Sequence, residues 1–295
     1  MKVRIVLLLI MVASQPLLAG SSDNPDIPPI SSSQQWHPGK FVWGDLITDD
    51  VAAAKAFYSG LLGWEFQTLN RPRGSYLIGF NNGRPVGGVL EAPPKQAAKG
   101  QPRWIGYISV TDLTQAMQSV ALAGGKVLLA PKSLPGRGEQ AIFSDPEGAV
   151  FGLIKTATGD PEDYLANPGD WIWVQLLSRD TATAGEFYRS VAGYDVIADE
   201  TKAGRNSLVL AADGYARATI MDIPRDRPSL QPAWLPFVRV DTLSQSLTRT
   251  TVLGGRVLLA PRPDLLEGHL AVVADPTGAA IGLIEWPQSD AEGGK

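Results

Sequence analysis

The stretch GGKVLLAP, residues 124–131, returns as GGRVLLAP at residues 254–261, an offset of 130 positions. The two stretches differ only where Lys126 becomes Arg256. Such a return at a long fixed spacing indicates an internal duplication rather than a chance match. We therefore expect one module to occur twice in the chain.

Other matched residues carry the same offset far beyond these two stretches. The pairs are Trp43 and Trp173, Asp50 and Asp180, Phe57-Tyr58 and Phe187-Tyr188, Trp104 and Trp234, and Asp145-Pro146 and Asp275-Pro276. A constant offset means no net insertion between the copies. We place the first copy at residues 39–157, a linker at 158–169, the second copy at 170–286 and a polar tail at 287–295.

The amino-acid composition excludes several kinds of functional site. The chain has 295 residues, no cysteine and only two histidines, so disulfides, thiolate metal sites and a cysteine nucleophile are excluded. The net charge is −4 and no basic run occurs, which argues against nucleic acid as a partner. Hydrophobic residues make up 44%, enough for two cores.

The N-terminal residues 1–20 are typical of a secretory signal peptide. Lys2 and Arg4 precede an apolar run that is too short to span a bilayer, and a small-residue cleavage site follows near Ala19. We expect a periplasmic or secreted product without a stable membrane anchor. The proline- and serine-rich residues 21–38 predict a flexible tether.

Within each copy the pattern predicts two successive units, and each unit consists of a strand, a helix and three further strands. In the first copy Asp50 is the expected cap of a helix over residues 51–62, which Gly63 ends. Its apolar residues recur at three- and four-residue spacing, so one face is buried. Asn82-Gly83 predicts a hairpin turn between two later strands.

These elements carry a resemblance to a known family. The residues concerned are Phe41-Val42-Trp43 at the opening, Asp50 with Phe57-Tyr58, Leu62-Gly63-Trp64 and Asp145-Pro146-Glu147-Gly148. The set resembles the vicinal oxygen chelate superfamily of glyoxalases, bleomycin-resistance proteins and extradiol dioxygenases, and most of all its tandem-domain, glyoxalase-like branch. The resemblance implies an α+β fold in which two βαβββ units per domain form a curled sheet around a cup.

The resemblance also implies metal ligands on the first and last strand of each unit. Carried onto this sequence, the first-strand positions are Trp43, Ile105, Trp173 and Leu235, and the last-strand positions are Gly88, Gly152, Thr219 and Gly282. None of them is a histidine or a carboxylate, which are the donors that such cations need. We therefore expect no metal and no other cofactor.

Strand alternation predicts which side chains face each cup. In the first copy these are Phe41, Trp43, Asp45, Ile105, Tyr107 and Ser109, and in the second copy Trp171, Trp173, Gln175, Leu235, Phe237 and Arg239. An aromatic lining with few polar groups suits a flat apolar ligand. The candidate ligand-binding residues are Trp43, Asp45, Tyr107, Trp173, Gln175, Phe237 and Arg239. The alternative is that the aromatic side chains simply fill the cups.

Asp45 is the one candidate catalytic residue, because a carboxylate among aromatic side chains could act as an acid or a base. The alternative is that it accepts hydrogen bonds from a neighbouring loop. Its counterpart Gln175 cannot transfer a proton. His37 and His269 lack a second histidine at ligand spacing, so both are expected at the surface.

Three hypotheses follow from the sequence. The first is an exported, metal-free, glyoxalase-like protein that binds a small apolar or aromatic molecule. The second is a metal-dependent lyase or dioxygenase with ligands drawn from Asp45, Glu91, Glu139 or His269. The third is a structural or interaction protein with filled cups. A homodimer is possible, and pairing of units within or between copies stays open.

Overall fold

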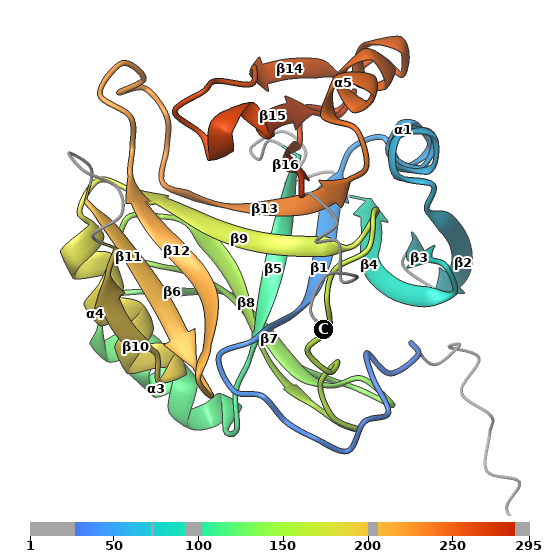
Figure 1. Cartoon of the computed structure of the whole chain (residues 1–295). Coiled ribbons are helices and arrows are strands. Elements are labelled where there is room, and N and C mark those ends of the chain that lie inside the picture. Colours follow the sequence, from blue (N-terminus) through green and yellow to red (C-terminus); the bar gives the residue numbers. More distant parts are fainter. Residues whose placement is uncertain (1–26, 72–73, 92–101, 200–205, 287–295) are drawn as a thin grey trace, which may run out of the picture.

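The computed structural model describes residues 27–71, 74–91, 102–199 and 206–286, which form two eight-stranded mixed sheets, one from each copy (Figure 1). The strands of the first sheet are β1 (Phe41–Thr48), β2 (Glu65–Arg71), β3 (Gly74–Asn81), β4 (Arg84–Glu91), β5 (Arg103–Ser109), β6 (Lys126–Leu134), β7 (Gly138–Ser144) and β8 (Val150–Thr156). Those of the second are β9 (Trp171–Ser178), β10 (Asp195–Ala198), β11 (Ser207–Ala212), β12 (Tyr215–Asp222), β13 (Ala233–Val240), β14 (Arg256–Leu259), β15 (Leu270–Ala274) and β16 (Ala280–Glu285).

The two sheets have the same topology. The first runs β2-β3-β4-β1-β5-β8-β7-β6 and the second β10-β11-β12-β9-β13-β16-β15-β14. Two units join within each sheet, because β1 pairs with β5 and β9 with β13 in antiparallel fashion. The predicted α+β fold of tandem βαβββ units is confirmed, and the units of one copy share one sheet.

Four helices occur in the described residues: α1 (Val51–Leu62), α3 (Leu113–Leu122), α4 (Thr181–Ala192) and α5 (Leu243–Val252). A short 3-10 turn, η1 (Leu266–Gly268), precedes β15. The predicted caps of α1 are present: Asp50 accepts a hydrogen bond from the Ala53 amide, and Gly63 ends the helix at a φ of 73°. None of these helices is long and apolar enough to cross a membrane.

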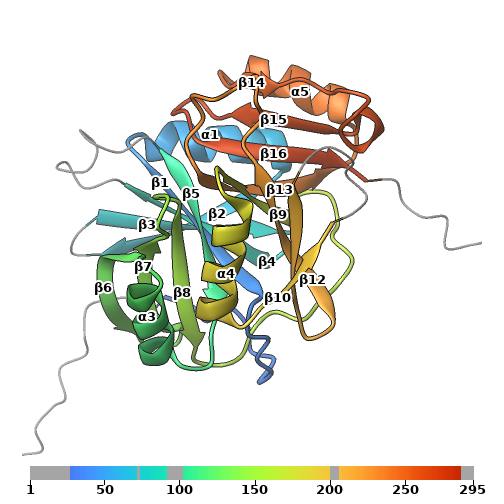
Figure 2. The same cartoon turned by 90° about the vertical axis from the view of Figure 1, so that its left-hand side faces the viewer.

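Each helix packs on strands of its own sheet and also against one helix of the other copy. α1 lies beside α5 and α3 beside α4 (Figure 2). One core joins the second unit of the first copy to the first unit of the second copy, and another core joins the remaining two units. The two copies therefore share each of these hydrophobic cores, while each sheet stays within one copy.

The motif residues that carried the resemblance lie at these crossed cores. The Tyr58 hydroxyl donates to Asp275 Oδ2 at 3.2 Å, and in the mirror position Tyr188 donates to Asp145 Oδ2 at 3.1 Å. An indole adds a further hydrogen bond to each of these tyrosines. Trp104 donates to the Tyr58 hydroxyl, and its counterpart Trp234 donates to the Tyr188 hydroxyl. The Phe-Tyr and Asp-Pro motifs thus bind one copy to the other.

The repeated glycine pair belongs to the same junction. Gly124 has a φ of 85°, as expected where a helix ends. Gly125 is needed for space, because a Cβ there would lie 2.8 Å from the Ser144 carbonyl and 3.0 Å from the Phe187 ring of the other copy. Gly255 faces Phe57 in the same way, at 2.7 Å. The duplicated stretch is therefore shaped by contact between the copies.

Part of the predicted tether differs from the expectation. Residues 27–38 are ordered against the first copy, since Gln34 donates its amide to the Thr158 carbonyl and Asp160 donates to that of Gln35. Ile27 and Ile30 are buried in a core cluster of the first sheet. The apolar pair lies among prolines and serines, which concealed its burial. The predicted signal peptide, the rest of the tether and the polar tail lie outside the described residues.

Candidate functional site

Each sheet curls, and its concave face is the place where the resemblance implies a site (Figure 1). We call these faces the first cup and the second cup. The first cup is lined by Trp43, Asp45, Tyr76, Ile105 and Tyr107, and the second by Trp173, Gln175, Thr219, Leu235 and Phe237.

Strand register sets which positions lie side by side in each cup. Gly88 pairs with Asp45 and Gly152 with Tyr107. In the second cup Thr219 pairs with Gln175 and Gly282 with Phe237. The predicted last-strand positions therefore do not pair with the predicted first-strand positions Trp43, Ile105, Trp173 and Leu235. Each pairs instead with the residue two positions later in the first strand of its unit.

Aromatic rings cover three of the four last-strand positions. A Cβ on Gly152 would overlap the Tyr107 ring, and one on Gly282 would overlap the Phe237 ring. A Cβ on Gly88 would overlap the Tyr76 hydroxyl. Where the resemblance implies a cation donor, the chain has a glycine with a ring packed over it. Adding a side chain there requires moving that ring.

The first cup contains a buried hydrogen-bond network centred on Asp45. Its Oδ1 accepts from the Tyr76 hydroxyl at 2.7 Å and from the Trp43 indole at 2.8 Å. Asp45 is only 2% exposed and Trp43 only 5%. Burial, with the nearby charge of Asp45, raises the pKa of Tyr76 and of Tyr107 well above the usual range. Both phenols therefore stay protonated and can donate.

Arg137, from the turn between β6 and β7, completes this network. Its guanidinium lies 4.1 Å from the Trp43 ring centre, and Nη1 donates to the Tyr76 hydroxyl at 3.0 Å. Arg137 is 2% exposed, and its positive charge balances that of buried Asp45 through the shared phenol. A planar cation from the chain itself thus stacks on the indole that was predicted to hold a ligand.

The ordered N-terminal segment closes the first cup. Ile27 and Ile30 pack in one buried cluster with Trp43, Tyr76 and Tyr107. Hydrogen bonds from Trp36 to the Thr156 carbonyl and from the His37 amide to Asp160 hold the segment in place. The first cup is therefore filled by its own side chains, as one of the sequence hypotheses expected.

The second cup differs, because its central side chains are only half-buried. Trp173, Gln175 and Leu235 all retain solvent exposure, although their counterparts Trp43, Asp45 and Ile105 are buried. The Trp173 indole donates to Thr219 Oγ1 at 3.0 Å, so its ring orientation is fixed.

Within the part of the chain that the structure describes, the groups that fill the first cup have no equivalent in the second. Strand pairing places Ser207 where the first cup has Tyr76. Glu267, at the offset of Arg137, is exposed. By the offset of 130, Ala157 and Asp160 correspond to Ile27 and Ile30, but both contact the first copy, where Asp160 accepts hydrogen bonds from Ser109 and Thr156. The second cup therefore has the indole of Trp173, and its described residues include no counterpart of Tyr76, Arg137, Ile27 or Ile30 that covers it.

Four predicted cup residues lie elsewhere. A bulge in each first strand turns Phe41 and Trp171 to the opposite face, where Phe41 packs 4.9 Å from Trp234 and Trp171 packs 5.1 Å from Trp104. Simple alternation fails at a bulge. Ser109 donates to Asp160 at 2.6 Å, and Arg239 donates to the carbonyls of Ala166 and Trp286. Arg239 is thus committed to backbone oxygens.

The residues considered as atypical metal ligands are not brought together. Asp45 lies inside the first cup, whereas His269 lies 3.7 Å from Glu285 near the surface. Among the described residues no group of three histidine or acidic side chains could hold an ion. His37 is also a surface residue, 3.8 Å from Asp213.

Sequence reasoning missed the residues that close the first cup. Tyr76 follows from alternation in β3, since it shares a face with Ile78. Arg137 had one signal, its position between two glycines at φ values of 77° and 121°, which lets a tight turn enter the cup.

Comparisons with known proteins agree with this fold. The sequence profile described as the glyoxalase/bleomycin resistance protein/dioxygenase superfamily matches residues 40–153. The anthracycline biosynthesis protein DauV of Streptomyces sp. (strain C5) is 30% identical over 260 residues, which cover 84% of this chain and 94% of DauV. The putative glyoxylase CFP32 of Mycobacterium bovis is 29% identical over 253 residues, covering 85% and 96% of the two chains.

Solved structures share the architecture at low identity. The Mn(II)-bound glyoxalase from Novosphingobium aromaticivorans has a TM-score of 0.56 and 17% identity, covering 84% of this chain and 82% of its own. The 2,3-dioxygenase LapB from Pseudomonas sp. KL28 has a TM-score of 0.57 and 11% identity, covering 88% and 96%. With its two matched sheets and its relatives along most of its length, the chain belongs to the glyoxalase/bleomycin resistance protein/dioxygenase superfamily.

Proposed function

We propose that the protein binds a small, flat, mainly apolar molecule in the second cup, and that it does so without a metal ion. The observation that carries this proposal is that Trp173 keeps part of its surface exposed, whereas its counterpart Trp43 is buried under Arg137. An indole with a fixed orientation and a free face is a good surface for stacking a planar ligand.

Gln175 supplies the polar contact. It lies beside Thr219 in the register of β9 and β12, two residues from Trp173, and it is half-buried. An amide can both donate and accept, so it can orient a ligand carbonyl or hydroxyl group. Leu235 on the neighbouring strand adds an apolar contact, and it pairs directly with Gln175.

The donor groups of the second cup support binding without a metal. Four paired strand positions lie side by side in this cup, and they carry an amide (Gln175), a hydroxyl (Thr219), a phenyl ring (Phe237) and a glycine (Gly282). Divalent cations in such sites are held by imidazole, thiolate or carboxylate groups. These four residues do not fit that requirement, so no step of the proposed function passes through a metal.

Two relatives support a flat ligand. DauV and the related DnrV of Streptomyces peucetius are named for anthracycline biosynthesis, and anthracyclines are built on flat fused rings. We propose the same general shape for the ligand of this chain, together with an exported location directed by residues 1–20. Comparing the protein content of periplasm and cytoplasm in cells that produce the full chain tests the location.

Calorimetric titration with alizarin, a flat dihydroxyanthraquinone, tests the binding site. Wild type should bind, and Trp173→Ala should weaken binding by about tenfold, the upper range for loss of an aromatic stack. Val174→Ala, on the opposite face of the same strand, is the matched control and should bind as wild type does. Equal binding by all three proteins would place the ligand elsewhere.

Metal analysis of the dialysed protein separates the proposal from a metal-dependent lyase or dioxygenase. A divalent ion that stays bound at one per chain would favour the enzyme hypothesis and contradict ours. Should alizarin and a wider set of planar compounds all fail to bind, the remaining hypothesis is an interaction protein.

A further inference from the structure

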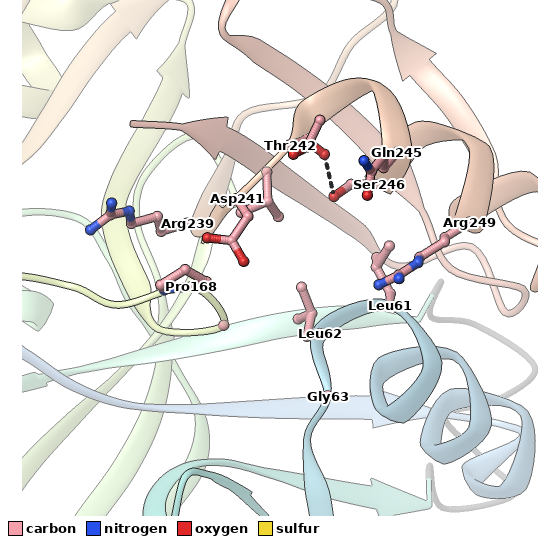
Figure 3. A pocket seen from close by; sticks show the side chains of 12 residues that line it. Leu61, Leu62, Gly63, Pro168, Arg239, Asp241, Thr242, Gln245, Ser246 and Arg249 are labelled. Atoms are coloured by element: carbon pink, nitrogen blue, oxygen red, sulfur yellow. Dashed lines mark hydrogen bonds between the residues drawn. The ribbon is translucent and has the colours of Figure 1, made fainter. Parts of the chain in front are cut away.

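A cavity of about 270 Å³ lies away from both cups, between the end of α1 and the start of α5 (Figure 3). The nearly buried Leu61 and Leu62 form an apolar wall, and polar side chains of α5 form the opposite side. The cavity thus lies where a helix of the first copy meets a helix of the second.

Three charged residues line this cavity: Arg239, whose guanidinium donates to the carbonyls of Ala166 and Trp286, and the opposite charges Asp241 and Arg249. Asp241 precedes α5 and Arg249 lies in its last turn, and Figure 3 shows the carboxylate and the guanidinium both directed into the space. Asp241 lies two residues before α5 begins, and the helical rise from Leu243 to Arg249 adds about 9 Å along the axis. Among the described residues, no hydrogen bond or ion pair of the Asp241 or Arg249 side chain is present, so both charges are open to a ligand.

The duplication provides an internal comparison for these charges. At the offset of 130, the matching positions beside α3 are Thr111 and Ser119, and Gln245 corresponds to Gln115. α3 also packs more closely on α4 than α5 does on α1. Asp241 and Arg249 therefore lie at the looser of the two equivalent helix junctions. At the other junction the two matching positions carry hydroxyl groups.

We propose that this cavity binds a linear zwitterion, a small molecule with an amine at one end and a carboxylate at the other. The carboxylate would accept hydrogen bonds from the fork of Arg249, and the ammonium group would donate to Asp241. The chain between them lies on Leu61 and Leu62, which removes its methylene groups from water. Neither the cups nor the proposed aromatic ligand takes part.

Calorimetry with ε-aminocaproic acid as the probe tests this site on the full chain. Wild type should bind, and Asp241→Thr and Arg249→Ser should each weaken binding by about tenfold or more, as expected for one charged hydrogen bond. Both variants introduce the residue that the other copy already has, so their folding should be preserved. Arg249→Lys should restore part of the affinity, because it keeps the charge.

Three controls make the result specific. Caproic acid and hexylamine each lack one charge, and both should bind about tenfold more weakly than the zwitterion. Lys126→Ser removes an exposed cation outside the cavity and should leave binding unchanged. Trp173→Ala should also leave it unchanged, which separates this site from the second cup. Absence of binding by wild type at about 10 mM probe, or undiminished binding by the two charge-removing variants, would overturn the proposal.

Discussion

The two cups of this molecule have one topology and opposite interiors. In the first, Trp43 is covered by the guanidinium of Arg137 and by the N-terminal segment with Ile27 and Ile30. In the second, Trp173 is only half-buried, and no equivalent covering group occurs in the described residues. The strand order stayed the same while a few side chains closed one of the two faces. The two copies thus differ in how far their central side chains are buried, although their strand order is the same.

The largest expected difference between the cups concerns their indoles. Trp43→Ala should lower the free energy of unfolding by about 4 kcal/mol, since it empties a packed and hydrogen-bonded site. Trp173→Ala should cost about 2 kcal/mol, because the ring is already partly in water. Urea denaturation of both variants measures the difference. Equal losses would mean that the second cup is as tightly packed as the first.

Removing the buried cation should have the next largest effect. Arg137→Ala leaves Asp45 charged and unbalanced inside the first cup, and the expected cost is about 3 kcal/mol. Glu267→Ala is the matched change in the second copy and should alter stability by less than about 0.5 kcal/mol, because that residue is exposed. A double variant with Asp45→Asn should recover part of the loss. No recovery would show that the two charges are not coupled.

Outside the cups the copies should respond alike. Tyr58→Phe and Tyr188→Phe each remove one hydroxyl that links the copies, and each should cost about 1 kcal/mol. Equilibrium unfolding followed by circular dichroism gives both values. A marked difference between them would show that the crossed cores have diverged as well, which contradicts the symmetry seen in their hydrogen bonds.

The smallest expected effect is a pH dependence at the start of each copy. Lys40 and Asp170 occupy equivalent positions in the two copies. Lys40 forms an ion pair with Asp163, and Asp163 also pairs with Arg217. Asp170 pairs with Arg84. Partial burial alone would raise the pKa of Asp163, but hydrogen bonds from Arg217 and Lys40 outweigh it and hold the pKa below its usual value.

The stabilisation from Asp163 is therefore complete above the unfolded pKa and is lost as pH falls through the lower, folded pKa. Asp163→Asn should be less stable than wild type near neutral pH, and the two should converge in strong acid. Urea midpoints collected from neutral pH downward measure this convergence. A constant difference at every pH would mean that the ion pairs do not contribute.

The fold could be predicted because the duplication repeats each signal at a fixed offset. Asp50 and Gly63 bound α1 as their cap chemistry predicts, and Asn82-Gly83 forms the expected hairpin turn. These are local preferences that need no knowledge of distant contacts. The packing of α1 on α5 and of α3 on α4 could not be predicted, since Phe57 and Phe187 are equally apolar whichever copy they contact.

The cup interiors were only partly predictable. Trp43 and Tyr107 face inward as alternation requires, but a bulge turns Phe41 outward. Arg137 and Ile30 enter the first cup from a turn and from a segment rich in proline and serine, where no periodicity signals burial. Whether a cup is filled depends on such long-range contacts, which single-residue patterns do not encode.

The crossed cores have a consequence for how such a chain could arise and be divided. Because each crossed core contains buried residues of both copies, half of the chain would expose an apolar face if it were made alone. Two identical halves that exchanged these faces would form a symmetric dimer with the same interior. In this chain residues 158–169 join the two halves, so both crossed cores form within one molecule.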